Sequence, residues 1–199
     1  MEARMLDPHW VFAGAALGLV GSVRYAFAIT RGRVRPNLVT WSLWAAAPLI
    51  GFFAQLDSDV GLPAVMTLAA GAGPSIVVLT SVITRRHYTR RGIFDVACAV
   101  IAALALAIWL GLGAAPLAVL FAVAADAVAA LPTVVKAWRH PESENVLFYA
   151  LVGAGATITL MTISSWEPQA WAFVLYQISI CALLIGIIAT RRRAPAPHS

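Results

Sequence analysis

Asp126 is the residue of this chain whose type and position point most directly to chemistry. It stands inside the apolar run FAVAADAVAA, residues 121–130, and ten residues before Lys136. At a helical rise of about 1.5 Å per residue, this spacing places the carboxyl group roughly 15 Å from the basic end of its helix. A carboxyl group at that depth in a membrane is costly unless it faces a partner or water, so Asp126 is predicted to bind a ligand or to carry a proton.

Arg24 is the predicted partner of Asp126. It lies seven residues before Arg31, which corresponds to about 10 Å along a helix. The functional interpretation is that the two charges face each other, where they bind substrate charges or move a proton. Two alternatives stay open: a buried ion pair that only fixes helix packing, and an arginine that extends to the lipid headgroups.

Aromatic and amide side chains are predicted to line the same site. One helical face carries Asn37, Trp41, Trp44, Pro48 and Gln55, at spacings of four, three, four and seven. This face could offer amide hydrogen bonds and an indole surface to a ring-shaped or cationic ligand, although tryptophan near a membrane surface is also a common anchor. The remaining candidate binding residues are Tyr25, Tyr149, Tyr176 and Gln177.

Two segments are predicted to act as hinges. The first is GAGP, in which Gly71, Gly73 and Pro74 lie at mid-membrane depth, and the second is Pro132. Proline removes an N–H donor from a helix and glycine tolerates the bend, so the first segment could form a hinge or a broken helix. The alternative is that its glycines only permit close helix packing, as expected for GAGA at residues 153–156.

The elements that position these residues are predicted to be membrane helices. Hydrophobic residues make up 61% of the 199-residue chain and charged residues 12%, against about 25% charged in soluble domains. The apolar residues form seven blocks close to the roughly 20 residues that cross a bilayer. The predicted spans are residues 10–30, 38–56, 63–83, 93–112, 115–137, 146–163 and 170–190. The fold class is therefore an all-α membrane protein of seven helices.

The distribution of charge predicts the orientation of these spans. Arginine and lysine gather after the first, third and fifth spans and in the C-terminal tail, whereas the alternate loops carry Asp57, Asp59 and Glu167. The positive-inside rule places the N-terminus outside and the C-terminus in the cytoplasm, in a bacterial inner membrane. The first block is expected to stay in the mature protein, because acidic Glu2 and Asp7 precede it and no clear cleavage site follows.

Several function classes find little support in the composition. The net charge of +5 comes from short loops without interleaved aromatic residues, so no nucleic-acid partner is expected. Cys98 and Cys181 lie in apolar spans, and all four histidines lie outside the spans, so neither a metal site nor a disulfide framework is expected. The only lysine, Lys136, is at the end of the fifth span, which excludes retinal attachment in the seventh. No cofactor is expected.

An internal repeat is predicted from a shift of 105 residues. The shift places Arg31 on Lys136, Pro36 on Pro141, Trp44 on Tyr149, Pro63 on Pro168 and Arg86 on Arg191. The alternative is a chance coincidence of prolines at helix ends. The repeat divides the chain into a first three-helix unit (residues 1–92), a linker helix (93–113), a second three-helix unit (114–190) and a basic, disordered tail (191–199). Because three helices are an odd number, the linker helix makes the two units parallel.

The segment LPTVVKAWRHPES, residues 131–143, resembles the PQ-loop motif, in which a proline near the cytoplasmic end of a helix precedes a basic residue and a short loop. With the 3+1+3 order of spans, the chain is similar to the PQ-loop superfamily, which includes SWEET sugar transporters, lysosomal amino-acid exporters and KDEL receptors. It departs from the motif at Thr133, where the family has glutamine, and at Phe27, where the first unit lacks the proline equivalent to Pro132.

The resemblance implies a transporter that moves a small polar metabolite by alternating access, through a midplane cavity between the two units. Proton coupling through Asp126 is an extension of this expectation. A receptor or accessory protein of the same fold is the alternative, and an intramembrane enzyme is a third class with little support, because no nucleophile accompanies Asp126. The expected partners are a small-molecule substrate and the lipid bilayer, and a homo-oligomer stays open.

Overall fold

The computed structural model describes residues 5–34, 36, 38–87 and 93–193. Within these ranges the chain is all-α, with one short 3-10 turn and no β-strand. The helices are α1 (Trp10–Thr30), α2 (Leu38–Asp57), α3 (Ala64–Thr84), α4 (Ile93–Leu112), α5 (Ala115–Arg139), α6 (Val146–Thr162) and α7 (Pro168–Arg193), and the turn η1 (Pro141–Ser143) lies between α5 and α6.

The predicted spans coincide with these helices to within one to three residues at each end. The largest difference is at the end of α7, which continues to Arg193. The first residues of the predicted disordered tail are therefore helical, because Arg191 and Arg192 donate hydrogen bonds to the backbone oxygens of Trp138 and Pro141. The rest of that predicted tail, residues 194–199, lies outside the described residues.

Five of the helices, α1, α2, α3, α5 and α7, are long and apolar enough to cross a membrane, and α6 is an apolar helix of 17 residues. Large apolar side chains face outward from the bundle, including Leu79, Ile83 and Leu110, which are 61%, 71% and 70% exposed. An apolar surface of this kind matches hydrocarbon better than water. The described chain thus has the helices and the surface of an integral membrane protein, as predicted.

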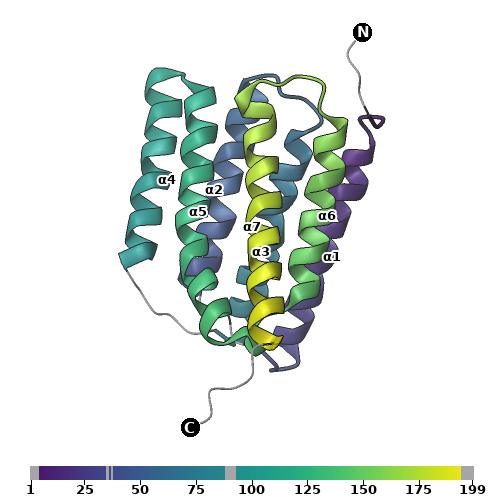
Figure 1. Ribbon diagram of the computed structural model, residues 1–199. Coiled ribbons are helices and arrows are strands. Elements are labelled where there is room, and N and C mark those ends of the chain that lie inside the picture. Colours follow the sequence, from purple (N-terminus) through teal and green to yellow (C-terminus); the bar gives the residue numbers. More distant parts are fainter. Residues whose placement is uncertain (1–4, 35, 37, 88–92, 194–199) are drawn as a thin grey trace.

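Successive helices run in opposite directions, up and down the bundle (Figure 1). Helix α3 packs against α1 and α2, α7 packs against α5 and α6, α1 contacts α6, and α2 contacts α5. These contacts close a ring in the order α1, α3, α2, α5, α7, α6. Helix α4 lies at the edge of the bundle against α5 and, less extensively, α2 (Figure 1).

The two ends of the bundle differ in charge. At the end called here the basic end, α1, α3, α5 and α7 finish, and the described residues Arg31, Arg33, Arg85, Arg86 and Lys136 lie there. At the opposite, acidic end, the connections carry Asp57, Asp59 and Glu167. This is the alternation that the sequence indicated.

Local sequence explains where several helices begin and end. Helix α1 stops before Gly32, whose φ of 71° lies in the left-handed region that glycine adopts without strain. Helix α6 begins after Asn145, whose side-chain oxygen accepts a hydrogen bond from the N–H of Leu147 at 3.1 Å. Prolines Pro48, Pro74 and Pro132 lie inside α2, α3 and α5 without ending them.

Helix α3 is continuous through the GAGP segment, so the broken-helix alternative for Gly71–Pro74 is wrong. A Cβ atom on Gly71 would lie 2.7 Å from Leu49 Cγ of α2, and one on Gly73 would collide with Ser22 Oγ of α1. These glycines allow α3 to approach both neighbours closely, which is the packing alternative. A hinge at Gly71, Gly73, Pro74 or Pro132 stays a prediction.

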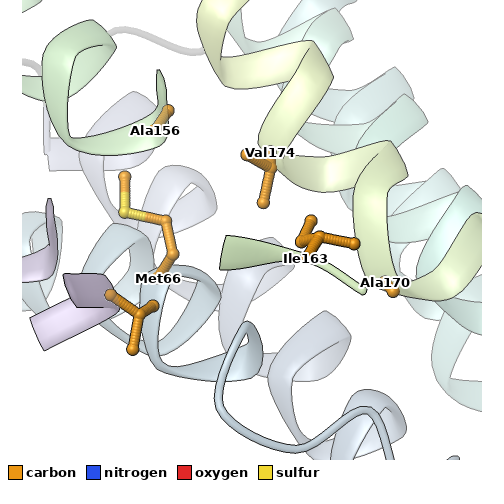
Figure 2. Close-up of a cluster of buried hydrophobic side chains, with 6 residues drawn as sticks. Met66, Ala156, Ile163, Ala170 and Val174 are labelled. Atoms are coloured by element: carbon orange, nitrogen blue, oxygen red, sulfur yellow. The ribbon is translucent and has the colours of Figure 1, made fainter. Parts of the chain in front are cut away.

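A buried apolar cluster fills the acidic end. Figure 2 shows Met66 of α3, Ala156 of α6, Ile163, and Ala170 and Val174 of α7 converging there. Val11 at the start of α1 completes the cluster. Each of these side chains is at most 5% exposed, so this end of the bundle is closely packed.

Candidate functional site

The basic end contains a cavity of about 1570 Å³, which we call the large cavity. Its walls come from the second half of α1, the first half of α2, the last turns of α5 and the start of α6. Known small-molecule sites occupy roughly 300–1,000 Å³, so this cavity has room for a metabolite together with water. It is partly open and reaches the basic end, where Arg31, Arg33 and Arg192 line it.

Aromatic side chains of three helices form one wall of the large cavity. The ring of Trp41 lies 4.8 Å from Tyr25 and 5.4 Å from Trp44, measured between centroids. Phe148 of α6 lies 6.5 Å from Tyr25, and Tyr149 lies 5.3 Å from Phe148. These distances are in the range of favourable aromatic contacts. Packing among the rings fixes the shape of this wall.

The side of the large cavity near η1 carries a charged network. Glu144 Oε1 lies 3.0 Å from Lys136 Nζ, and Tyr149 Oη donates a hydrogen bond of 2.7 Å to Glu144 Oε2. Arg192 donates to the backbone oxygens of Pro141 and Glu144. The network joins the ends of α5 and α7 to the start of α6, and only 11% of the Glu144 side chain is exposed.

A second, smaller cavity of about 80 Å³ lies deeper in the bundle, and we call it the inner cavity. Its lining includes Asp126 of α5, Tyr176 and Gln177 of α7, and Pro74 of α3. The Asp126 carboxyl group is buried and accepts a hydrogen bond from the Tyr176 hydroxyl. This volume holds water but is too small for most metabolites. The inner cavity can therefore hold a proton or a small ion close to Asp126.

Three aromatic residues, Trp44, Phe148 and Tyr149, line both cavities. These residues therefore lie at the boundary between the two cavities. The indole Nε1 of Trp44 is buried and has no hydrogen-bond partner within the described part of the chain.

Close helix packing seals the acidic end. A Cβ atom on Gly14 of α1 would collide with the backbone oxygen of Gly155 of α6, and the reverse also holds. Between α2 and α7, the fully buried Gln55 donates from Nε2 to the backbone oxygen of Gln169 at 2.7 Å. The close contact at Gly155 agrees with the packing role expected for the GAGA segment. The large cavity has no lining residue from the outer turns at this end, whereas Met66, in the first turn of α3, lines the inner cavity.

The structure divides the predicted site residues between the two cavities. The large cavity contains Arg24, Tyr25, Trp41, Trp44, Pro132 and Tyr149. The inner cavity contains Asp126, Tyr176, Gln177, Pro74 and, shared with the large cavity, Trp44 and Tyr149. Gly71 and Gly73 line neither of them, and Asn37 lies outside the described residues.

The predicted contact between Arg24 and Asp126 is wrong. Arg24 is exposed to the large cavity, whereas Asp126 is buried in the inner cavity and bonded to Tyr176. Counting residues along a helix predicts the depth of each charge but not the direction in which its side chain points. Trp41 is only 8% exposed, so it does not anchor the chain at the membrane surface.

Two residues of the site were missed by sequence analysis. Glu144 follows Lys136 by eight residues across a turn, a spacing that no helical rule relates to a contact. Phe148 directly precedes Tyr149, which the shift of 105 residues aligns with Trp44, and that adjacency was a usable signal. No protein-family model, no curated protein and no solved structure matches the chain.

Proposed function

We propose that this protein is a membrane transporter that moves a small polar metabolite by alternating access. One observation carries the proposal: the bundle holds a large, partly open cavity that reaches the basic end, while apolar side chains pack closely at the acidic end. A transporter in its inward-open state needs this asymmetry. The positive-inside rule makes the basic end cytoplasmic, so the cavity opens toward the cytoplasm.

The proposal includes two parallel three-helix repeats, residues 1–92 and 114–190, joined by α4. The helix bounds support this division. Adding 105 to Trp10, the first residue of α1, gives Ala115, the first residue of α5. Adding 105 to Asp57, the last residue of α2, gives Thr162, the last residue of α6. These two bounds agree with the shift found in the sequence, and the other four bounds of the paired helices differ from it by one to four residues.

Helix packing supports the same division. In the first unit α3 packs against both α1 and α2, and in the second α7 packs against both α5 and α6. Contacts between the units are also paired, since α1 meets α6 and α5 meets α2. An exchange of the two units leaves this pattern of contacts unchanged. Rocking of one unit against the other is the motion that alternating access requires.

An arginine at the end of the third helix of each unit makes the same kind of hydrogen bond. Arg86 Nη1 donates to the backbone oxygens of Ile29 and Thr30, at the end of α1. Arg191, its equivalent, donates from Nε to the backbone oxygen of Trp138 at the end of α5. In both units the guanidinium binds carbonyls that a helix end leaves without intrahelical partners. This shared hydrogen-bonding arrangement supports a common origin of the two units.

The inner cavity supports a role for Asp126 in coupling. In this proposal, closure of the aromatic boundary between the cavities isolates the Asp126 carboxyl group, and its opening exposes the group to the large cavity. A proton exchanged there would accompany the substrate. The resemblance to the PQ-loop superfamily adds to the proposal, since proton-coupled transporters occur in it.

Flux through liposomes that contain the purified protein tests the proposal. Uptake of radiolabelled sugars, amino acids and carboxylic acids is measured for the wild type and for Ala28→Trp, which narrows the large cavity. Ala103→Trp, on the exposed face of α4, is the matched control. Saturable uptake that Ala28→Trp abolishes and Ala103→Trp preserves is expected. A ligand that stabilises the protein but is never moved would favour the receptor alternative instead.

A further inference from the structure

The charged side chains around the large cavity are mostly basic. The lining contains five basic and two acidic residues, namely Arg24, Arg31, Arg33, Lys136, Arg192, Glu142 and Glu144. A concave site with walls of one charge raises the local concentration of ions of the opposite charge. The large cavity thus attracts anions.

Both acidic residues of the lining already have neighbours that satisfy them. Glu144 is paired with Lys136 Nζ and accepts a hydrogen bond from Tyr149 Oη. Glu142 Oε1 lies 3.6 Å from His140 Nδ1 at the exposed rim. Neither carboxylate is free to serve as the main contact of a cationic ligand.

The lining includes two hydrogen-bond donors without a protein partner, the guanidinium of Arg24 and the indole of Trp44. Within the described part of the chain, Arg24 forms no hydrogen bond or ion pair, and the buried Nε1 of Trp44 has no hydrogen-bond partner. A guanidinium and an indole N–H can donate but cannot accept. A ligand that satisfies both groups must therefore supply acceptor oxygens.

We propose that the large cavity binds a small anionic ligand, through a carboxylate or phosphate group held by Arg24, with the Trp44 N–H as a second donor once the indole turns toward the cavity. The inference rests on the proposed function in one respect, since it names the substrate class of that transporter. Arg24 lies six residues before the end of α1 at Thr30, about 9 Å along the helix. The anionic group would therefore be held well inside the cavity rather than at its rim.

The aromatic wall provides for the rest of the ligand. Tyr25, Trp41 and Phe148 present ring faces and edges on the same side of the cavity as Trp44. Such rings bind an apolar chain or a ring of the ligand by burying its surface. The complete site suits a compact organic acid better than a bare inorganic ion.

Titrations followed by tryptophan fluorescence test the inference, because Trp41 and Trp44 line the cavity. The purified full-length protein in detergent is titrated with succinate, phenylacetate and inorganic phosphate. The affinity for each organic anion is compared with the affinity for a neutral partner of similar shape. Phenylacetamide and succinamide are those partners. Saturable binding of at least one organic anion is expected, with an affinity at least tenfold higher than that of its amide.

Three variants identify the group that selects the anion. Arg24→Gln is expected to weaken anion binding about tenfold or more and to leave amide binding unchanged. Trp44→Phe keeps an aromatic side chain but removes the indole N–H, and a smaller loss of anion affinity is expected. Arg139→Gln removes the same charge from a residue outside the cavity lining, and wild-type binding is expected.

An anionic lipid headgroup could supply the same chemistry, and nanodiscs separate the two sources. Discs of phosphatidylcholine alone and discs that include phosphatidylglycerol are titrated with phenylacetate. Equal affinity in both indicates a soluble anion as ligand. Competition by phosphatidylglycerol that Arg24→Gln removes indicates a lipid headgroup, and this result keeps the anion site but changes its source.

Two results would overturn the anion site. The first is the absence of saturable binding for all three anions, and the second is equal binding of anions and amides in wild type and Arg24→Gln. Liposome flux keeps this inference apart from the proposed function. Uptake of neutral metabolites unaffected by Arg24→Gln would refute the anion site and retain the transporter. Binding of anions without any uptake would retain the site and refute the transporter.

Discussion

The basic and acidic ends of the bundle are built in opposite ways. At the acidic end, α1 and α6 meet at Gly14 and Gly155 with no side chain between them, and apolar residues fill the remaining space (Figure 2). At the basic end, large aromatic and charged side chains hold the same helices apart around a cavity. Residue size therefore decides which end of the bundle is closed.

The comparison also indicates what opening the acidic end would require. Described contacts at that end are mainly apolar side chains and backbone surfaces, with two hydrogen bonds as polar additions, from Gln55 to Gln169 and from the Leu6 N–H to the Met161 backbone oxygen. Separation of such surfaces exposes apolar area and these hydrogen-bonding groups but no buried ion pair. A motion of this kind is compatible with repeated cycles, because apolar surfaces re-form without the cost of desolvating charges.

The largest effect is expected from Gly14→Ala at the acidic end. The new Cβ atom would collide with the backbone oxygen of Gly155, so α1 and α6 must separate, and a loss of about 3 kcal/mol in unfolding free energy is expected. Thermal unfolding in detergent measures it. Gly18→Ala is the control one turn away, where a Cβ atom meets nothing within 4 Å. Equal melting temperatures for the two variants would show that the acidic end is not tightly packed.

Next in size is the coupling between Asp126 and Tyr176, midway between the two ends. A double-mutant cycle with Asp126→Ala and Tyr176→Phe is expected to give an interaction of about 2 kcal/mol, because the carboxyl group accepts the tyrosine hydrogen bond. The cycle with Asp126→Ala and Arg24→Gln is expected to be additive within about 0.5 kcal/mol. If the cycle instead shows coupling between Asp126 and Arg24, the two residues form an ion pair, and this result would contradict the structure.

A smaller effect is expected from Glu144→Gln at the basic end. The change removes the charge that pairs with Lys136 but keeps an acceptor for Tyr149, so a loss of about 1 kcal/mol is expected. Thermal unfolding at low and high salt measures it, and the difference between wild type and variant should shrink as salt screens the pair. A loss as large as that of Gly14→Ala would contradict the contrast between the two ends.

The sequence predicted the helices far better than it predicted their contacts. Apolar blocks of membrane length fixed the helix bounds, since a bilayer demands about 20 residues per span. Depth along a helix also followed from counting, and Asp126 does lie deep in the bundle. The facing of side chains did not follow, because it depends on how each helix is rotated in the ring. Arg24 and Asp126 were paired by depth alone, and they point into different cavities.

Helical periodicity also did not predict the contacts between residues of different helices. Glu144 meets Lys136 only because η1 turns the chain back on α5, and Phe148 reaches Tyr25 only because α6 packs on α1. The sequence separation of such residues does not follow the periodicity of a helix, so a helical pattern does not predict the contact. The shift of 105 residues was the one long-range signal that the sequence offered. It aligned Trp44 with Tyr149, and both residues line both cavities.

The smallest predicted effect concerns the arginine that closes α1 at the basic end. Arg86→Gln removes the donors to the backbone oxygens of Ile29 and Thr30, and a loss of about 0.5–1 kcal/mol is expected from a helix end that water can still reach. Arg85→Gln, one residue earlier and with its side chain exposed, removes the same charge and should leave the melting temperature unchanged. If the two variants behave alike, net charge and not the hydrogen bonds stabilises this end. A loss confined to Arg86→Gln would mean that the basic end is held by hydrogen bonds at its helix ends, leaving the cavity between them open.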